Sequence, residues 1–316
     1  MRVFHSAAEV PADFGPAAVT IGNFDGVHVG HREILRQLVR IAKDKSLVPA
    51  VLTFDPHPAR VLAPDRAPRL IETVAQRLRK FAEEGIEAAL VLPFSFEFAG
   101  LSPEEFARQI LQDSLRSRVV MVGEDFRFGY RQSGNIETLR QLGTEFGFEL
   151  LPVPAIQRQT VRVSSTAIRS LVSSGKVSKA ARLMARPFAL EGQVVQGYGI
   201  GTRQTVPTLN LAPENELLPA EGVYATRTRD EDSGQEWRSI TNVGSRPTFD
   251  GTSLTIETYL LDSAPPVAPA RIEVSFLAFV REERRFESPE ALKAQIMRDV
   301  GVVQRFHRRV AHLHVG

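Results

Sequence analysis

Short apolar runs alternate with amphipathic stretches through the first half of the chain. The runs that suit buried strands are Ala17–Ile21, Val48–Phe54, Ala88–Leu92, Val119–Val122 and Glu149–Val153. The stretches with apolar positions at helical spacing are His31–Leu47, Thr73–Glu84, a segment that opens at Ser102, and Ile136–Phe146. This alternation predicts βαβ units and a doubly wound, mostly parallel sheet, with ligands beyond the carboxyl ends of its strands.

Local signals mark two of these helix ends. Ser102 precedes Pro103 and stands three residues before Glu105, which is the pattern of an N-cap, a proline at the first helical position and a glutamate at the third. Gly85 follows the helix predicted over Thr73–Glu84. It predicts the end of that helix, because glycine readily takes the left-handed conformation that closes a helix.

Strand-like runs take over in the second half. They are Phe188–Gln196, Gly222–Thr228, Trp237–Val243, Ser253–Leu261 and Arg271–Val280. Gly, Pro, Asn and Asp separate these runs, so the pattern predicts an antiparallel barrel or sandwich. A terminal helix is predicted from Ser288 to about Val300. We therefore expect two domains, residues 1–185 and residues 186–316.

Composition and charge restrict the classes of function. The 316 residues include no cysteine, which excludes disulfides, thiolate metal ligands and a cysteine nucleophile and fits a reducing, cytoplasmic location. The formal net charge of +2 does not favour nucleic-acid binding. No apolar run reaches the ~18 residues that a membrane helix needs, and Met1–Val10 lacks the apolar core of a signal peptide. Small anionic ligands suit this balance of charge better than a long polyanion.

One segment carries candidate chemistry between the first predicted strand and the helix that follows it. The sequence G-N-F-D-G-V-H-V-G-H occupies Gly22–His31. Glycines allow a tight turn there, and the start of a helix offers N–H groups and the positive end of its dipole to a phosphate. His28 and His31 lie three residues apart, so both imidazoles can face one bound group. The segment is a candidate phosphate site, although two surface histidines beside a turn also fit the pattern.

Four ordered motifs give the first half a family resemblance. They are the loop Gly22–His31, T-F-D-P-H-P at Thr53–Pro58, V-G-E-D-F-R-F-G at Val122–Gly129 and V-S-S-T-A-I-R at Val163–Arg169. Together they resemble the nucleotidyltransferase module of the bacterial FAD synthetase family, the bifunctional riboflavin kinase/FMN adenylyltransferases. The resemblance implies that this half joins ATP and FMN to give FAD and pyrophosphate by in-line attack, without a covalent enzyme intermediate.

The same resemblance implies roles for individual residues. The catalytic pair expected at the ATP phosphates is His28 and His31. The loop positions expected to bind ATP are Gly22, Asn23, Phe24, Gly26 and Gly30. The second phosphate clamp, at an expected helix N-terminus, is Ser164, Ser165, Thr166 and Arg169. The expected flavin-binding residues are Phe54, Pro56, His57, Pro58 and Asp125, and for Pro56–Pro58 a purely structural loop is the alternative. Asp125 is also placed to hold ribose hydroxyls or Mg²⁺, and as a turn residue it has a purely structural alternative.

The second half resembles the riboflavin kinase module of that family. The matching motifs are G-Q-V-V-Q-G at Gly192–Gly197, P-T-L-N at Pro207–Asn210, N-V-G-S-R-P-T-F at Asn242–Phe249, I-E-T-Y-L-L-D at Ile256–Asp262 and V-R-E-E-R-R-F at Val280–Phe286. The resemblance implies that Thr208 and Asn210 hold Mg²⁺ with ATP, and that Glu257 is the catalytic base that activates riboflavin. The glycines expected to bind phosphate in this half are Gly197, Gly199 and Gly201.

The phosphate loop of the second half departs from the family pattern. Family members usually read G-R-x-x-G-F-P-T-A-N, whereas this chain reads G-T-R-Q-T-V-P-T-L-N at Gly201–Asn210. Thr202 takes the arginine position and Thr205 takes that of the second glycine. An adenylyltransferase with a weak or inactive kinase is therefore an alternative to the bifunctional enzyme.

Two other classes of protein share parts of these patterns. One is a non-catalytic flavin-binding protein, and intact His28, Thr208 and Glu257 argue against it. The other is a different transferase, such as a cytidylyltransferase or a pantetheine-phosphate adenylyltransferase, because the two-histidine loop alone is shared among those families. The kinase-like second half disfavours it. The pattern leaves oligomeric state open.

Overall fold

The computed structural model shows two compact units, Met1–Ser165 and Thr166–Gly316. The residues that it describes are 1–154, 157–158, 161–195, 208–248, 251–262, 265, 267–284 and 286–313. The functional boundary expected between residues 185 and 186 stays a prediction.

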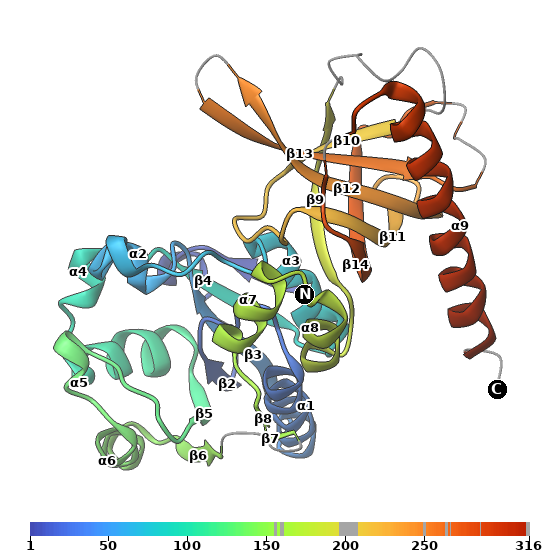
Figure 1. The fold of residues 1–316 in the computed structure, drawn as a ribbon. Helices are drawn as coiled ribbons and strands as arrows, with labels where there is room; N and C mark the ends of the chain where they lie inside the picture. The colour runs from blue at the N-terminus through green and yellow to red at the C-terminus, as the bar shows by residue number, and fades with distance from the viewer. Residues whose placement is uncertain are drawn as a thin grey trace. The chain divides into compact units, whose positions relative to one another are not determined.

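A parallel sheet forms the centre of the first unit (Figure 1). In spatial order, its described strands are β1 (Arg2–Phe4), β4 (Ala88–Leu92), β3 (Val48–Phe54), β2 (Ala17–Ile21), β5 (Ser117–Gly123) and β6 (Glu149–Val153). All neighbouring pairs are parallel. The predicted doubly wound sheet is confirmed, and only β1, too short to show a pattern, was missed. The strand order reverses between β2 and β5, so their carboxyl ends border the topological switch point, where such sheets bind ligands.

Helices cover both faces of this sheet. They are α1 (Val29–Asp44), α2 (Pro58–Leu62), α3 (Val74–Glu83), α4 (Phe96–Ala99), α5 (Pro103–Phe106), a π-helical continuation (Ala107–Ser114) and α6 (Ile136–Phe146). Short 3-10 turns lie at Ala7–Glu9, Pro64–Arg66 and Tyr130–Gln132. The predicted cap of α5 is confirmed, because the Ser102 hydroxyl accepts from Glu105 N–H and the Glu105 carboxylate accepts from Ser102 N–H.

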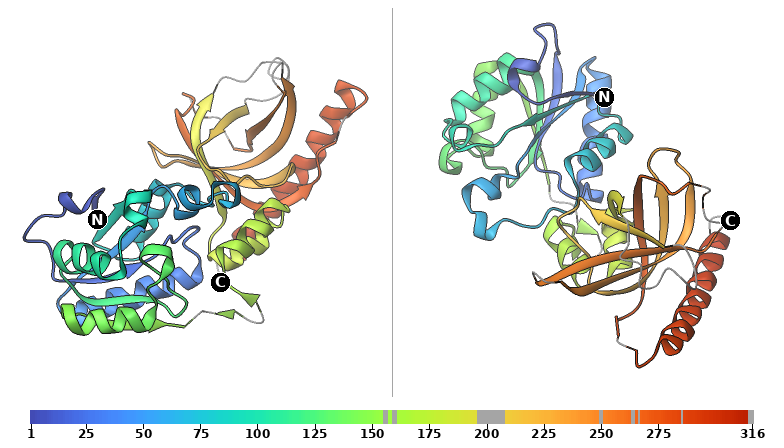
Figure 2. Two further views of the ribbon diagram at one scale, coloured as in Figure 1. Left: turned by 90° about the vertical axis from the view of Figure 1, so that its left-hand side faces the viewer. Right: turned by 90° about the horizontal axis from the view of Figure 1, so that it is seen from above.

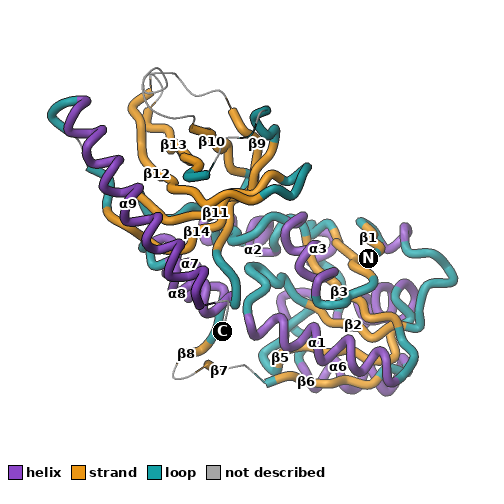
Figure 3. The backbone as a smooth tube through the Cα atoms, turned by 90° about the vertical axis from the view of Figure 1, so that its right-hand side faces the viewer, coloured by secondary structure: helices purple, strands orange, loops and turns teal. Residues whose placement is uncertain are grey.

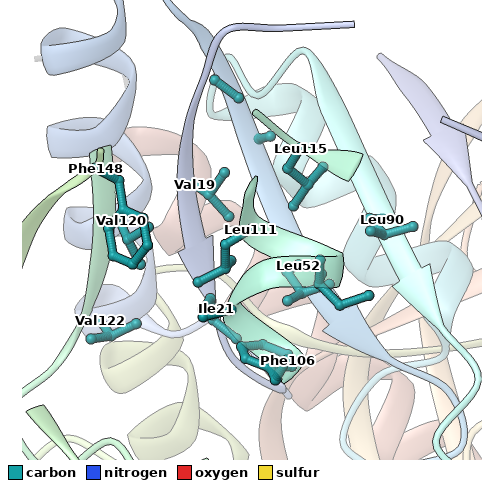
Figure 4. Close-up of a cluster of buried hydrophobic side chains, with 14 of the residues drawn as sticks. Val19, Ile21, Leu52, Leu90, Phe106, Leu111, Leu115, Val120, Val122 and Phe148 are labelled. Atoms are coloured by element: carbon teal, nitrogen blue, oxygen red, sulfur yellow. The ribbon is translucent and has the colours of Figure 1, made fainter. Parts of the chain in front are cut away.

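Alternate strand residues divide the first unit's core between the two faces. Val19 and Leu52 point toward the face that the π-helical stretch and α6 cover, and Figure 4 shows them packed with Leu111 and Phe106. Ala18 belongs to the opposite core, with side chains from α1 and α3. Each strand of the sheet centre is therefore buried on both sides, which is why these strands read as continuous apolar runs.

A closed barrel forms the second unit, and a sandwich, the other expected architecture, is excluded. Its described strands are β9 (Phe188–Val195), β10 (Thr208–Pro213), β11 (Gly222–Asp230), β12 (Glu236–Thr248), β13 (Gly251–Leu260) and β14 (Arg271–Arg281), in the spatial order β10-β13-β12-β11-β14-β9. Figure 3 shows this ring of strands in orange. Neighbouring strands are antiparallel.

Further helices complete the second unit. They are α7 (Ser165–Ser173), whose first residue belongs to the first unit, α8 (Val177–Met184) and α9 (Pro289–Leu313). A small hairpin of β7 (Gln157–Arg158) and β8 (Val161–Arg162) precedes them. Helix α9 lies along the outside of the barrel against β11, β12 and β14 (Figure 2). It continues well past Val300, where the sequence pattern predicted its end.

A chain of hydroxyl groups runs across the barrel interior. Its members, in order, are Thr228, Ser239, Thr226, Thr241 and Thr258, and all are fully buried. Successive oxygens are 2.8, 2.8, 2.8 and 2.9 Å apart. Each inner hydroxyl therefore exchanges hydrogen bonds with two neighbours, which offsets the cost of burying it.

Removal of one inner hydroxyl should weaken the barrel. We expect Thr226→Val to lower the free energy of unfolding by about 1–3 kcal/mol, because Ser239 and Thr241 each lose a buried partner. Thr226→Ser keeps the hydroxyl and is the matched control. Urea unfolding followed by the fluorescence of Trp237, the single tryptophan, reports on the barrel directly. Equal stability of the Val variant and the wild type would contradict this expectation.

Candidate active sites

The loop Gly22–His28, called the histidine loop below, connects β2 to α1 at the switch point. Gly22 N–H donates to Leu52 O at 3.0 Å, and Val27 N–H closes a turn on Phe24 O at 3.0 Å. Gly26 has a φ of 79°, and a Cβ there would lie 2.8 Å from Ile71 Cδ1. Position 26 therefore requires glycine for both its backbone and its space.

His28 is the N-cap of α1, which begins two residues earlier than the sequence pattern predicted. Its Nδ1 accepts a hydrogen bond from His31 N–H at 3.2 Å. The neutral imidazole therefore carries its proton on Nε2, the nitrogen that can donate to a ligand. The His28 and His31 rings stack with centroids 3.6 Å apart and planes 16° apart. The structure thus brings the predicted pair together.

The start of α1 suits an anion. Its first turn contains no acidic residue, so nothing there neutralises the positive end of the helix dipole. Gly30 is buried in this turn, and Phe24 packs edge-on against His31 at 5.1 Å. Backbone N–H groups and His28 Nε2 are the groups that such a site offers to phosphate oxygens.

Buried polar contacts hold the histidine loop, and the sequence pattern did not reveal them. The Asp25 carboxylate accepts from Ile71 N–H at 3.0 Å and from Glu72 N–H at 3.2 Å. Arg77 on α3 donates through Nη1 to Asn23 O at 2.7 Å. Burial lowers the pKa of the Arg77 guanidinium, although nearby carboxylates oppose this shift, and the group stays protonated at neutral pH.

The second predicted clamp begins beside the histidine loop. Ser165 Oγ donates to Asp25 O at 2.8 Å, which places the first residue of α7 against the loop. The helix N-terminus predicted there is present. Ser164 is half-buried, and Thr166 and Arg169 follow along α7. Their contact with phosphate stays a prediction.

An aromatic cluster surrounds the predicted flavin wall. Phe54, at the end of β3, packs edge-on against Phe94 at 5.6 Å. The cluster continues through Phe98, Phe106, Phe128 and Phe126, with neighbouring centroids between 5.5 and 6.0 Å apart. Its outer rings are only partly buried, so a flat apolar ring has faces to stack on. Of these residues only Phe54 was predicted to bind flavin, although Phe126 and Phe128 stand in the motif at Val122–Gly129.

The remaining predicted flavin residues have local structural roles. His57 caps α2, because its Nδ1 accepts from Ala59 N–H at 3.1 Å, and Pro58 is the first residue of that helix. Pro56 is exposed. Asp125 lies exposed in the turn closed by Phe126 N–H and Gly123 O at 3.0 Å, just after β5. These residues border the switch point, and their contact with flavin stays a prediction.

The predicted kinase residues gather on the outer face of the barrel. Asn210 lies opposite Glu257 on β13, and Glu257 lies opposite Asn242 on β12. Thr208 precedes Asn210 by two residues and so shares its face of β10. Asn242 Nδ2 donates to Glu283 Oε1 at 3.3 Å. The role of Asn242 and Glu283 here was missed, although both stand in quoted motifs.

The three glycines predicted to bind phosphate in this half, Gly197, Gly199 and Gly201, lie outside the described residues. Thr208 and Asn210 present a hydroxyl and an amide on a half-buried face beside a carboxylate. Hard oxygen donors of this kind fit Mg²⁺, which usually binds through few protein ligands together with substrate phosphates.

A glycine-containing loop with two histidines at a switch point, and a carboxylate opposite two amides on a barrel, are features that a two-domain phosphate-transferring enzyme would use. A family model described as FAD synthetase matches residues 10–167, and one described as riboflavin kinase matches residues 184–307. The chain belongs to the family of bifunctional riboflavin kinase/FMN adenylyltransferases.

Curated relatives match nearly the whole chain, and each is named a bifunctional riboflavin kinase/FMN adenylyltransferase. The chain is 34% identical to the protein of Escherichia coli (strain K12) over 95% of each protein. It is 34% identical to the protein of Pseudomonas fluorescens over 93% of this chain and 94% of the relative. It is 32% identical to the protein of Haemophilus influenzae over 97% of this chain and 98% of the relative.

A solved structure shares the fold of the whole chain. It is titled "Crystal Structure of Macrolide-efflux Protein from Streptococcus pneumoniae" and matches with a TM-score of 0.84 and 28% identity, over 96% of this chain and 98% of that chain. The efflux activity in its title is a statement about that protein. Among the described residues of this chain, no helix has the length and apolar character to cross a membrane.

Two substitutions at His28 distinguish its role as the N-cap of α1 from the role proposed for its Nε2. We expect His28→Ala to lower the free energy of unfolding of the first unit by about 1 kcal/mol, because the cap is lost. His28→Asn should cost only a few tenths of a kcal/mol, since asparagine is a favourable N-cap. Thermal unfolding followed by far-ultraviolet circular dichroism measures both. Equal stability of the Ala variant and the wild type would contradict the cap assignment.

Proposed function

We propose that this chain makes FAD from riboflavin in two steps, one in each half. The single observation that carries the proposal is the match of both enzyme domains to one chain, with a candidate site in each. Riboflavin and ATP give FMN and ADP in the barrel half. FMN and a second ATP give FAD and pyrophosphate in the sheet half.

The histidine loop would carry the adenylyl transfer. An oxygen of the FMN phosphate attacks the α-phosphorus of ATP, and the bond from that phosphorus to the bridging oxygen breaks as pyrophosphate leaves. The chain's task is to position the phosphates and balance their charge. His28 donates from Nε2, its stacked neighbour His31 completes the pair, and the start of α1 supplies backbone N–H groups. Ser165, whose hydroxyl donates to Asp25 O in the loop, would meet the same phosphates.

The aromatic cluster would hold the flavin of FMN near this loop. Phe54 ends β3, and its neighbour Phe98 presents a partly buried ring. Stacking on such rings suits the flat isoalloxazine, and the stiff segment at residues 56–58 would border it. Asp125 would hold ribose hydroxyls at the carboxyl end of β5.

The outer face of the barrel would carry the phosphorylation. Glu257 accepts the proton of the ribityl hydroxyl as that oxygen attacks the γ-phosphorus of ATP, and ADP leaves. Asn210 and Asn242 lie opposite Glu257 on the two neighbouring strands. Thr208 and Asn210 would hold Mg²⁺, which, when bound, balances the charge of the ATP phosphates.

The alternative with a weak or inactive kinase is not favoured. The riboflavin kinase model spans residues 184–307 and so includes the loop that departs from the family pattern. The full-length likeness to curated bifunctional enzymes also argues against the other transferases and a purely binding protein. Riboflavin, FMN and ATP are thus the proposed ligands.

Replacing the carboxylate of Glu257 by an amide should impair the phosphorylation of riboflavin and spare the formation of FAD from FMN. Glu257→Gln keeps the volume but removes the base, so we expect phosphorylation of riboflavin to slow by roughly 10²–10⁴-fold. Formation of FAD from supplied FMN should be unchanged. Glu236→Gln, on an exposed part of β12, is the matched control and should change neither rate. Full kinase activity in Glu257→Gln would remove Glu257 from this role.

His28→Asn should have the opposite effect. It keeps the cap of α1 but lacks the outward N–H of Nε2, and we expect adenylyl transfer to fall by roughly 10²–10³-fold. Rates from FMN and from riboflavin, measured separately with ATP and Mg²⁺, check this. A wild-type protein that makes no FAD from FMN would refute the proposed function itself.

A further inference from the structure

The histidine loop has a backbone conformation that needs support from outside the loop. Phe24 has a φ of 49° and Val27 a φ of 24°, although neither is glycine. Residues in this left-handed region are strained and persist where their surroundings over-determine them. The groups that hold the loop therefore help to determine the geometry of the candidate site.

Arg77 is one of these groups, and its contact with the loop is a hydrogen bond to one backbone carbonyl. Its Nη1 donates to Asn23 O at 2.7 Å and to Thr53 Oγ1 at 3.2 Å. The Thr53 hydroxyl in turn donates to the same Asn23 oxygen at 3.4 Å. One guanidinium thus joins α3, the end of β3 and the histidine loop in a closed set of hydrogen bonds.

Burying a full charge in order to bind one carbonyl carries a large desolvation cost. Arg77 is only 3% exposed, and its Nε has no hydrogen-bond partner within the described part of the chain. A neutral donor could bind Asn23 O with a smaller desolvation cost. A buried group retained at such a cost calls for a functional explanation.

The charge itself has a use at this position. The cation lies one hydrogen bond from the histidine loop, where the proposed function places the ATP phosphates. Weak screening in the protein interior lets a fixed cation act on negative charge that develops nearby. The carboxylates of Asp25 and Asp55 attract the same guanidinium and keep it charged.

We propose that Arg77 is a positioning residue for adenylyl transfer: through the Asn23 carbonyl it fixes the loop that presents His28 to the ATP phosphates. The inference rests on the proposed function of the sheet half. It adds a buried residue that belongs to none of the motifs that carry the family resemblance.

The test compares two substitutions at position 77 in the full chain. Arg77→Met removes both hydrogen bonds and the charge, and kcat for FAD formation from FMN should fall by roughly 10²-fold, the effect of a slight misplacement of reacting groups. The KM for FMN should stay within about twofold, because the flavin wall is intact. Arg77→Lys keeps the charge and one donor and should recover roughly tenfold in kcat.

Two controls separate positioning from general damage. Lys80→Met removes a partly exposed cation, paired with Glu83, from the same helix α3 and should leave kcat unchanged. Riboflavin kinase activity of each variant, from the other half of the same chain, should also stay at the wild-type value. Circular dichroism checks that each variant is folded.

Several results would overturn the proposal. A kcat for Arg77→Met within threefold of the wild type would do so, as would a lysine variant no faster than the methionine variant. If Arg77→Met does not fold, Thr53→Val decides, because it removes two of the three hydrogen bonds that hold the Asn23 carbonyl and Arg77 together, and leaves the charge and the direct Arg77–Asn23 bond in place. Its kcat should fall roughly tenfold, and an unchanged kcat would overturn the proposal. A wild-type protein inactive with FMN would instead refute the proposed function.

Discussion

The candidate site of the first unit depends on buried polar contacts that hold a strained loop. The carboxylate of Asp25 binds two backbone N–H groups, and the guanidinium of Arg77 binds the Asn23 carbonyl. These contacts hold the loop that leads into α1, and His28 caps the start of that helix with its Nδ1, which leaves the proton of the neutral imidazole on Nε2. Apolar contacts alone would not hold the histidine loop in this conformation, because only directional hydrogen bonds can specify the orientation of a backbone segment.

Much of this architecture follows from the sequence. The strands of the sheet centre are buried on both faces, so runs such as Val48–Phe54 coincide with the observed strand, and the cap at Ser102 is present. The barrel was harder to specify, because strand spacing fits a sandwich equally well. Closure instead reflects pairing of β9 with both β10 and β14, a long-range property.

Some residues of the candidate sites could likewise be predicted from the sequence, and others could not. Loop glycines and histidines are adjacent in the chain, so their pattern points to the histidine loop. Asn210 and Glu257 lie opposite each other on β10 and β13, and their role in phosphorylation stays a prediction. Arg77 lies far from the loop in sequence and looks like one more charge on an amphipathic helix, although it shares a helix face with buried Phe81. The aromatic cluster around Phe54 was missed for the same reason, since its members come from separate elements.

The proposed function assigns one reaction to each half of the chain. Mixing two single variants, His28→Asn and Glu257→Gln, with riboflavin, ATP and Mg²⁺ tests it most directly. Neither variant alone should make FAD from riboflavin at more than a small fraction of the wild-type rate. The mixture should make it readily, because the first supplies FMN and the second adenylylates it. A mixture that stays inactive, although each variant retains its own reaction, would contradict the account.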